Sequence, residues 1–69
     1  MSRRTVEVLQ YAGHAHVARI TYESDLREYR VRIDNDPKSD YFTDTDIDAR
    51  VTGWAMLSHA HELDQKENA

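Results

Sequence analysis

Four histidines occur as two His-Ala-His pairs, and these are the first residues that could bind a metal ion. The pairs are His14/His16 and His59/His61. In an extended segment, the imidazoles of the first pair would point to the same side and could share an ion. In a helix, residues two apart point about 200° apart, so the second pair cannot chelate from one face. A zinc site needs further ligands from elsewhere in the chain. We predict no metal site.

The residue spacing does not support calcium binding, phosphate binding or nucleophilic catalysis. Residues 44–48, Asp-Thr-Asp-Ile-Asp, resemble the start of a calcium loop, but Ala49 and Ala55 replace the required Gly and Glu. No serine lies in a Gly-x-Ser-x-Gly turn, and two glycines cannot form a phosphate-binding loop. The chain has no cysteine, which excludes a thiolate nucleophile. We therefore predict a binding protein without cofactor or catalytic residues, and not an enzyme.

Negative charge is concentrated between residues 34 and 48. This segment contains six aspartates and one lysine, a net charge of −5, whereas the whole chain carries −4. The remainder of the chain therefore has a net charge of +1. Oppositely charged surfaces raise association rates by about 10- to 1,000-fold, so the segment favours a basic partner. A competing structural role exists, because three of the aspartates suit the start of a helix.

The predicted partner-binding site combines these carboxylates with two aromatic side chains. Tyr41 and Phe42 lie among the aspartates and can anchor apolar contacts beside the charges. Carboxylates arranged in this way can resemble DNA phosphates and occupy a surface on which a protein normally holds nucleic acid. The predicted site comprises Asp34, Asp36, Asp40, Tyr41, Phe42, Asp44, Asp46 and Asp48.

Three segments with strand character must position these residues. Residues 5–11 are rich in β-branched and aromatic side chains, and residues 16–23 and 28–34 alternate between apolar and polar. The alternation predicts an antiparallel sheet with one face on a core and one face in water. Gly13 and Pro37 mark turns, and residues 40–43 predict a short fourth strand.

A helical pattern follows the acidic segment and should run to about Leu63. Its predicted buried face comprises Ile47, Val51, Trp54, Ala55 and Ser58, and Met56 and Leu57 widen it. The fold class is therefore α+β, an antiparallel β-meander of three to four strands with one C-terminal helix packed on one face. The predicted core comprises Val6, Val8, Ile20, Tyr22, Tyr29, Val31, Ile33, Phe42, Ile47, Val51, Trp54 and Leu57.

The chain length of 69 residues predicts one domain, residues 1–69, with residues 1–4 and 64–69 frayed. No apolar run follows the N-terminal arginines, and no segment approaches the roughly 18 apolar residues of a membrane span. We expect a cytoplasmic protein without membrane contact. Exposed strand edges permit dimerisation, but we expect a monomer.

Together these features resemble the small anti-CRISPR proteins of phages and mobile elements. The resemblance rests on residues 18–23, Ala-Arg-Ile-Thr-Tyr-Glu, on 29–33, Tyr-Arg-Val-Arg-Ile, and on 40–44, Asp-Tyr-Phe-Thr-Asp. The resemblance covers most of the chain and lies in general character, since these proteins share no common motif. It implies an inhibitor in a bacterial host cell that blocks DNA binding by a subunit of a type I CRISPR complex, with type I-C the first choice. It also implies no direct binding of nucleic acid.

Two alternatives remain open at this point. An antitoxin-like regulatory protein would bind its partner by adding a strand at an open sheet edge. A nucleic-acid binder would instead use Arg19, Arg30 and Arg32 on the solvent face of the sheet. Glutamates are interleaved with these arginines, and no aromatic side chain is expected among them to stack on a base.

Overall fold

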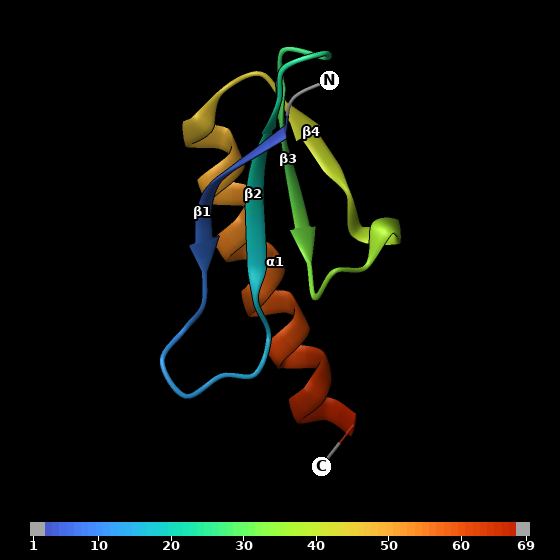
Figure 1. Ribbon diagram of the computed structural model, residues 1–69. Coiled ribbons are helices and arrows are strands. Elements are labelled where there is room, and N and C mark those ends of the chain that lie inside the picture. Colours follow the sequence, from blue (N-terminus) through green and yellow to red (C-terminus); the bar gives the residue numbers. More distant parts are fainter. Residues whose placement is uncertain (1–2, 68–69) are drawn as a thin grey trace.

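The computed structural model describes residues 3–67, which form a four-stranded antiparallel sheet with one long helix across one face (Figure 1). The elements are β1 (Arg3–Leu9), β2 (Ala18–Glu23), β3 (Glu28–Ile33), the 3-10 helix η1 (Pro37–Ser39), β4 (Tyr41–Thr43) and α1 (Asp46–Glu67). The strands lie side by side in chain order, β1-β2-β3-β4. The predicted α+β meander with one C-terminal helix on the sheet is confirmed.

Regular structure reaches further toward both ends of the chain than the sequence pattern suggested. Arg3 and Arg4 belong to β1, and α1 continues past its predicted end at Leu63 to Glu67. The last turns of α1 are tied to the rest of the protein by Asp64, whose carboxylate lies 2.5 Å from His16 Nε2. Of the residues predicted to fray, 1, 2, 68 and 69 lie outside the described residues.

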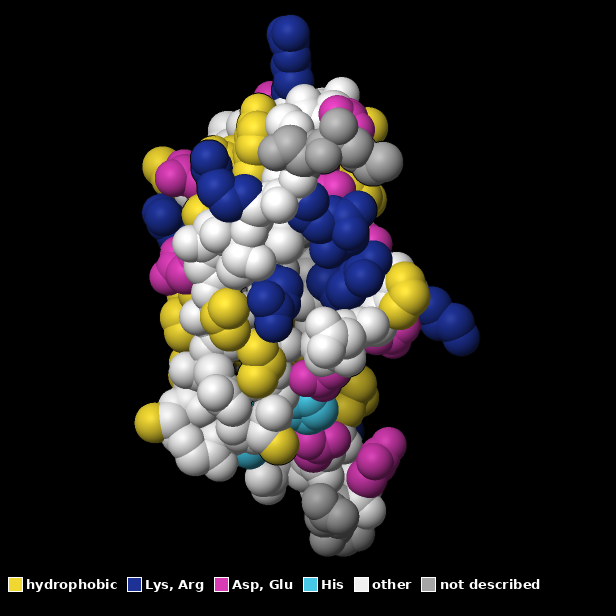
Figure 2. All heavy atoms as spheres, viewed as in Figure 1, with side chains coloured by type: hydrophobic (Ala, Val, Ile, Leu, Met, Phe, Trp, Pro, Cys, Tyr) yellow, Lys and Arg dark blue, Asp and Glu magenta, His cyan; other side chains and the backbone are white. Residues whose placement is uncertain are grey.

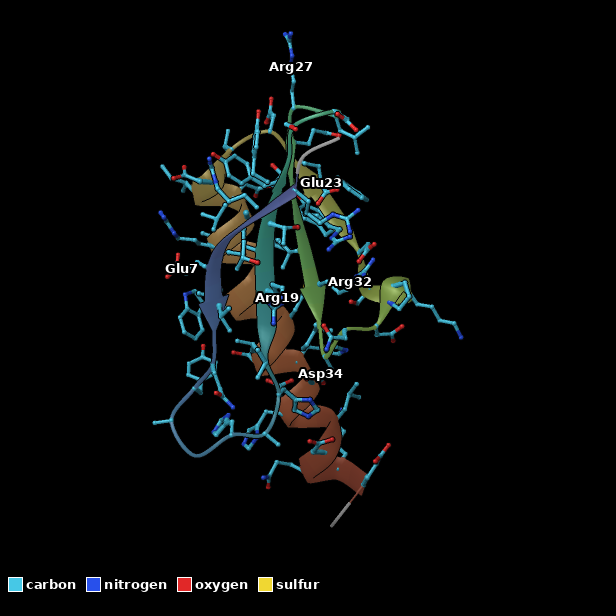
Figure 3. All side chains as sticks on the ribbon, viewed as in Figure 1. Glu7, Arg19, Glu23, Arg27, Arg32 and Asp34 are labelled. Atoms are coloured by element: carbon cyan, nitrogen blue, oxygen red, sulfur yellow. The ribbon has the colours of Figure 1, made fainter. Side chains whose placement is uncertain are left out.

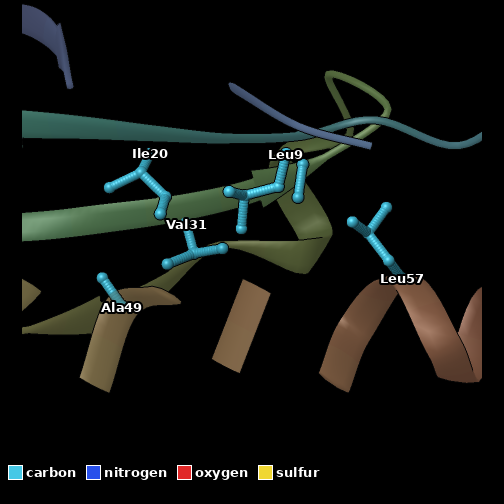
Figure 4. Packing of buried hydrophobic residues seen from close by; sticks show 6 residues of the cluster. Leu9, Ile20, Val31, Ala49 and Leu57 are labelled. Atoms are coloured by element: carbon cyan, nitrogen blue, oxygen red, sulfur yellow. The ribbon is translucent and has the colours of Figure 1, made fainter. Parts of the chain in front are cut away.

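The core lies between the sheet and α1 (Figure 4). The register of β2 and β3 pairs Ala18 with Ile33 and Ile20 with Val31, which places these side chains on the face that α1 covers. The buried apolar residues are Leu9, Ala18, Ile20, Val31, Ala49 and Leu57. The partly buried residues Tyr29, Ile33, Trp54 and Met56 pack around them.

Gly53 allows α1 to lie close to the sheet. A Cβ atom at this position would lie 2.7 Å from Leu9 Cδ1 and 3.5 Å from Val31 Cγ1. Ala49, Gly53 and Leu57 follow one another at intervals of four residues and form the buried stripe of the helix. The small residues of this stripe therefore set the distance between the two layers.

The helix face that the sequence pattern selected is only partly buried, since Leu57 lies in the core and Trp54 and Met56 pack against it. Ile47 and Val51 are 70% and 63% exposed, and Ala55 and Ser58 are exposed as well. The prediction that Ile47 and Val51 belong to the core is wrong. The physical reason is the close approach at Gly53, which leaves room for small side chains on the facing stripe and turns the larger aliphatic residues outward.

The facing of β1 also differs from the prediction. The pairing of β1 with β2 shifts register between Thr5 and Glu7, and such a bulge reverses which side chains face the core. Val6 and Val8, predicted in the core, are exposed, whereas Leu9 is buried. Glu7 faces the helix, where its Oε1 accepts a hydrogen bond from Arg50 Nε at 2.7 Å.

Two aromatic residues of the predicted core occupy other environments. Phe42 is 43% exposed because it pairs across the strands with Arg30, on the face of the sheet that α1 does not cover. Tyr22 is half-buried, and its ring contacts Tyr29 at 5.0 Å between centroids in an edge-on arrangement. Phe42 therefore belongs to the surface, and Tyr22 to the margin of the core.

Candidate functional site

The six aspartates of the acidic segment lie in three separate places. Asp34 follows the end of β3 (Figure 3), Asp36 and Asp40 flank η1, and the other three lie at the start of α1. Tyr29, near the start of β3, pairs with Thr43, which directly precedes the turn into α1. Asp34 is therefore separated from the helix start by the length of β3, about 17 Å at the usual rise per residue. The eight predicted residues do not share one surface.

Asp34 is bound within the protein. Its Oδ1 accepts a hydrogen bond from the Val17 N–H at 3.0 Å, and its Oδ2 lies 2.5 Å from His16 Nδ1. Burial alone would raise the pKa of Asp34, but the bonds from Val17 and His16 outweigh burial and lower it. This carboxylate therefore fastens the segment before β2 to the end of β3, and both of its oxygens have partners within the protein.

Asp36 and Asp40 also have internal partners. Asp36 caps η1, since its Oδ1 accepts a hydrogen bond from the Lys38 N–H at 3.0 Å. Asp40 forms a bidentate pair with Arg32, with Nε–Oδ1 at 2.6 Å and Nη2–Oδ2 at 2.7 Å. The Arg32 guanidinium lowers the pKa of Asp40. Both residues hold the β3–β4 connection in place.

The three remaining aspartates surround exposed apolar side chains on the first turns of α1. Thr45 caps this helix by accepting a hydrogen bond from the Asp48 N–H at 3.2 Å. Ile47 and Val51, four residues apart on the helix, are the most exposed large apolar side chains among residues 3–67. We call this region the acidic–apolar surface; it comprises Tyr41, Asp44, Asp46, Ile47, Asp48 and Val51.

Tyr41 joins β4 to this surface. Its hydroxyl donates a hydrogen bond to Asp48 Oδ2 at 2.8 Å, and this bond lowers the pKa of the carboxyl group. The ring itself remains partly exposed. Arg50, the nearest cation on the helix, bonds to Glu7 at 2.7 Å and lies 3.5 Å from Asp46. Asp44 and Asp48 form no ion pair among residues 3–67, so the surface keeps its negative charge.

The opposite face of the sheet carries arginine side chains. Figure 2 shows this face, with Lys and Arg atoms gathered over its middle. Arg19 on β2 pairs directly with Arg32 on β3, and Arg30 pairs with Phe42 on β4. Arg3 and Arg32 have carboxylate partners, Glu23 at 2.9 Å and Asp40. We call this region the outer face; it comprises Arg3, Arg19, Thr21, Glu23, Glu28, Arg30, Arg32 and Phe42.

Sequence reasoning missed the aromatic side chain on the outer face. Tyr41 and Phe42 are adjacent in a strand and must face opposite sides of the sheet. The sequence does not reveal which of the two lies beside the arginines, because this depends on the register between β3 and β4. The expectation that no aromatic residue lies among the arginines is wrong.

The histidines do not converge as the spacing of His14 and His16 would allow. His16 lies between the carboxylates of Asp34 and Asp64, whereas the ring of His14 stacks on His61 at 3.9 Å between centroids. Within residues 3–67, no group of three or more His, Cys, Asp or Glu side chains is arranged to hold a metal ion. Over the same residues, no helix is both long and apolar enough to cross a bilayer.

Comparisons with known proteins add nothing to this geometry. No protein-family model, no curated protein and no solved structure matches the chain. The functional argument therefore rests on the two surfaces that lie on opposite sides of the protein.

Proposed function

We propose that the protein is a binding module that docks on a basic protein through its acidic–apolar surface. The observation that supports this most is the exposure of Ile47 and Val51 on adjoining helical turns. Single exposed apolar residues are ordinary, but neighbouring ones framed by polar groups are typical of protein contact sites. Here Asp44, Asp46 and Asp48 supply the polar frame.

The chemistry of this surface defines the partner that fits it. Two aliphatic side chains and the ring of Tyr41 suit an apolar depression, and the carboxylates suit a rim of lysine and arginine. Long-range attraction to such a rim would accelerate encounter and weaken as salt is added. A protein surface that binds nucleic acid is both basic and accessible, so it fits this description of the partner.

Within this function, the finer proposal is inhibition of a type I CRISPR complex, with type I-C the first choice. Asp44, Asp46 and Asp48 would take the places of DNA phosphates, while Ile47 and Val51 fix the position. The internal bonds of Asp34, Asp36 and Asp40 favour the helix start over the segment before it as the contact site. Under this proposal the protein acts as a monomer in the cytoplasm of a bacterial host cell.

A competition experiment tests the finer proposal. Purified type I-C complex is incubated with labelled target DNA and increasing amounts of this protein, and bound DNA is measured by gel shift. We expect wild type to displace DNA and the double variant D44N/D46N to require at least about tenfold more protein, which corresponds to 1.4 kcal/mol. Asp25→Asn removes a charge from the exposed turn between β2 and β3 and serves as the control.

The outcomes separate clearly. Equal inhibition by D44N/D46N and wild type would remove the aspartates at the helix start from the proposed site. Failure of wild type to displace DNA from this complex would overturn the finer proposal. The docking proposal itself would then depend on whether the acidic–apolar surface retains a basic protein.

A further inference from the structure

The outer face carries two arginines, Arg19 and Arg30, that form no ion pair among residues 3–67. We propose that this face binds single-stranded nucleic acid across β2, β3 and β4. The proposal goes beyond the docking function, because it concerns the opposite layer of the protein and a negatively charged ligand. It also departs from the expectation, taken from the resemblance, that the protein does not bind nucleic acid directly. It rests on three observations, one for each of Arg19, Arg30 and Phe42.

Arg19 and Arg32 face each other directly across neighbouring strands. Like charges in this position destabilise a sheet. Asp40 neutralises Arg32, but Arg19 is exposed, and the only hydrogen bond of its side chain among the described residues is a 3.5 Å contact with Thr5 Oγ1. The fold therefore retains an unfavourable pair of arginines, and the side chain of Arg19 is available to bind an anion.

Arg30 lies beside this pair and is only 8% exposed. Its Nε atom is buried without a hydrogen-bond partner, and Arg30 forms no ion pair among residues 3–67. The positive charge of Arg30 lowers the pKa values of Glu23 and Asp40, but neither carboxylate bonds to it. A guanidinium stays charged at all relevant pH values, so a buried one without a bonded acceptor is unfavourable. A phosphate placed over this part of the sheet would add negative charge beside it.

The carboxylates on the outer face are already committed or lie at one end. Glu23 accepts hydrogen bonds from Arg3 Nε and from the Thr21 hydroxyl, and Asp40 is held by Arg32. Glu28 pairs with Glu23 at the end of β3 that lies away from Arg32. The available positive charge therefore lies on Arg30 in the middle of β3 and on Arg19 of β2, away from Glu28.

Phe42 distinguishes a nucleic acid from other anions. It pairs directly with Arg30 and is partly exposed, so an aromatic surface lies next to the Arg30 guanidinium. Unpaired bases stack on such side chains irrespective of their identity, while neighbouring arginines hold the backbone. In a duplex the bases stack on one another and cannot reach Phe42. The geometry therefore favours a single strand with little sequence preference.

Fluorescence anisotropy with a fluorescein-labelled dT12 oligonucleotide in 50 mM salt tests the proposal. We expect wild type to bind dT12, Arg19→Gln to weaken binding about fivefold and Phe42→Ala about tenfold. Raising the salt to 200 mM should weaken wild-type binding more steeply than binding by R19Q, because the variant makes fewer phosphate contacts. Arg27→Gln is the matched control, since Arg27 extends from the turn between β2 and β3, away from this face (Figure 3).

Each remaining outcome would overturn the proposal. These outcomes are no binding of dT12 by wild type, equal affinity for a 12-base-pair duplex, or equal losses in R19Q and R27Q. Circular dichroism checks that F42A is folded, and R19Q provides a second variant whose substitution is fully on the surface. The double variant I47S/V51S should bind dT12 like wild type, so this proposal and the docking proposal fail independently.

Discussion

His16 is held between two carboxylates that come from different elements. Its Nδ1 lies 2.5 Å from Asp34 at the end of β3, and its Nε2 lies 2.5 Å from Asp64 near the end of α1. The hydrogen bonds to Asp34 and Asp64 raise the pKa of His16, and partial burial opposes them only in part. The charged imidazole therefore links the loop before β2, the sheet and the helix.

This arrangement predicts a pH dependence of stability. Since the folded pKa of His16 is raised above its unfolded value of about 6.5, its contribution is fully present below pH 6.5 and is lost as pH rises through the folded pKa. We expect the free energy of unfolding of wild type, measured relative to His16→Gln, to fall between pH 5.5 and pH 8.5. Urea denaturation at the two pH values measures this difference.

The control for this experiment is His59→Gln, which removes an exposed imidazole on α1. His59 forms no ion pair among residues 3–67, so H59Q should show the same fall in stability with pH as wild type. A pH dependence of stability that is equal in H16Q and wild type would contradict the stabilising role of the bonds from His16 to Asp34 and Asp64. The opposing pH dependence of Asp34, whose pKa is lowered, is confined to acid below about pH 4 and does not overlap this window.

At the scale of elements, the contact between α1 and the sheet depends on Gly53. In an isolated helix, alanine at this position would be more favourable by about 1 kcal/mol. Here its Cβ would meet Leu9 Cδ1 at 2.7 Å inside the core. Overpacking of this kind costs about 1–3 kcal/mol, so it should exceed the gain in helix propensity.

The contact between Gly53 and Leu9 leads to a prediction about stability. We expect Gly53→Ala to lower the free energy of unfolding by about 1 kcal/mol in wild type. The same substitution should be neutral or stabilising in a Leu9→Val background, because valine lacks the Cδ1 atom that the new methyl would meet. Chemical denaturation of the four proteins in this double-mutant cycle measures the coupling. A G53A protein that gains about 1 kcal/mol in wild type would show that the layers are not held by this contact.

The elements differ in how far the sequence determined them. β2 and β3 were predictable because each has two chemically distinct faces, with Ile20 and Val31 opposite Arg19 and Arg30. The buried face of α1 was not, because its key positions are Ala49 and Gly53, whose small size carries little weight in an apolar pattern. β1 was misread because nothing in its sequence marks a bulge at Val6.

The whole molecule places two surfaces of opposite charge on its two layers. The acidic–apolar surface lies on α1 and β4, and the outer face lies on the uncovered side of the sheet. The protein is elongated, with principal extents of 44 × 20 × 16 Å. The sheet and α1 both run along its length and are stacked on each other across it (Figure 1). A partner bound to the start of α1 therefore leaves the arginines of the sheet accessible.

The candidate site was only half predictable at this scale. Charge counting identified the acidic segment, and the helix-start aspartates with Tyr41 do share a surface. The internal roles of Asp34 and Asp40 depend on His16 and Arg32, which are far enough away in the chain that only the path of the turns brings them together. The exposure of Ile47 and Val51 could not be predicted, because apolar residues at helical spacing indicate a buried face. Only the structure shows that another face of α1 packs more closely on the sheet.

The most direct test of the docking surface is quantitative mass spectrometry of proteins captured on the immobilised protein. The lysate comes from a bacterium that carries a type I CRISPR system. We expect wild type and Leu26→Ser, which alters an exposed leucine in the turn between β2 and β3, to retain the same basic nucleic-acid-handling protein. The double variant I47S/V51S should lose at least about 90% of it, a tenfold effect. Equal capture by I47S/V51S and wild type would contradict the central claim.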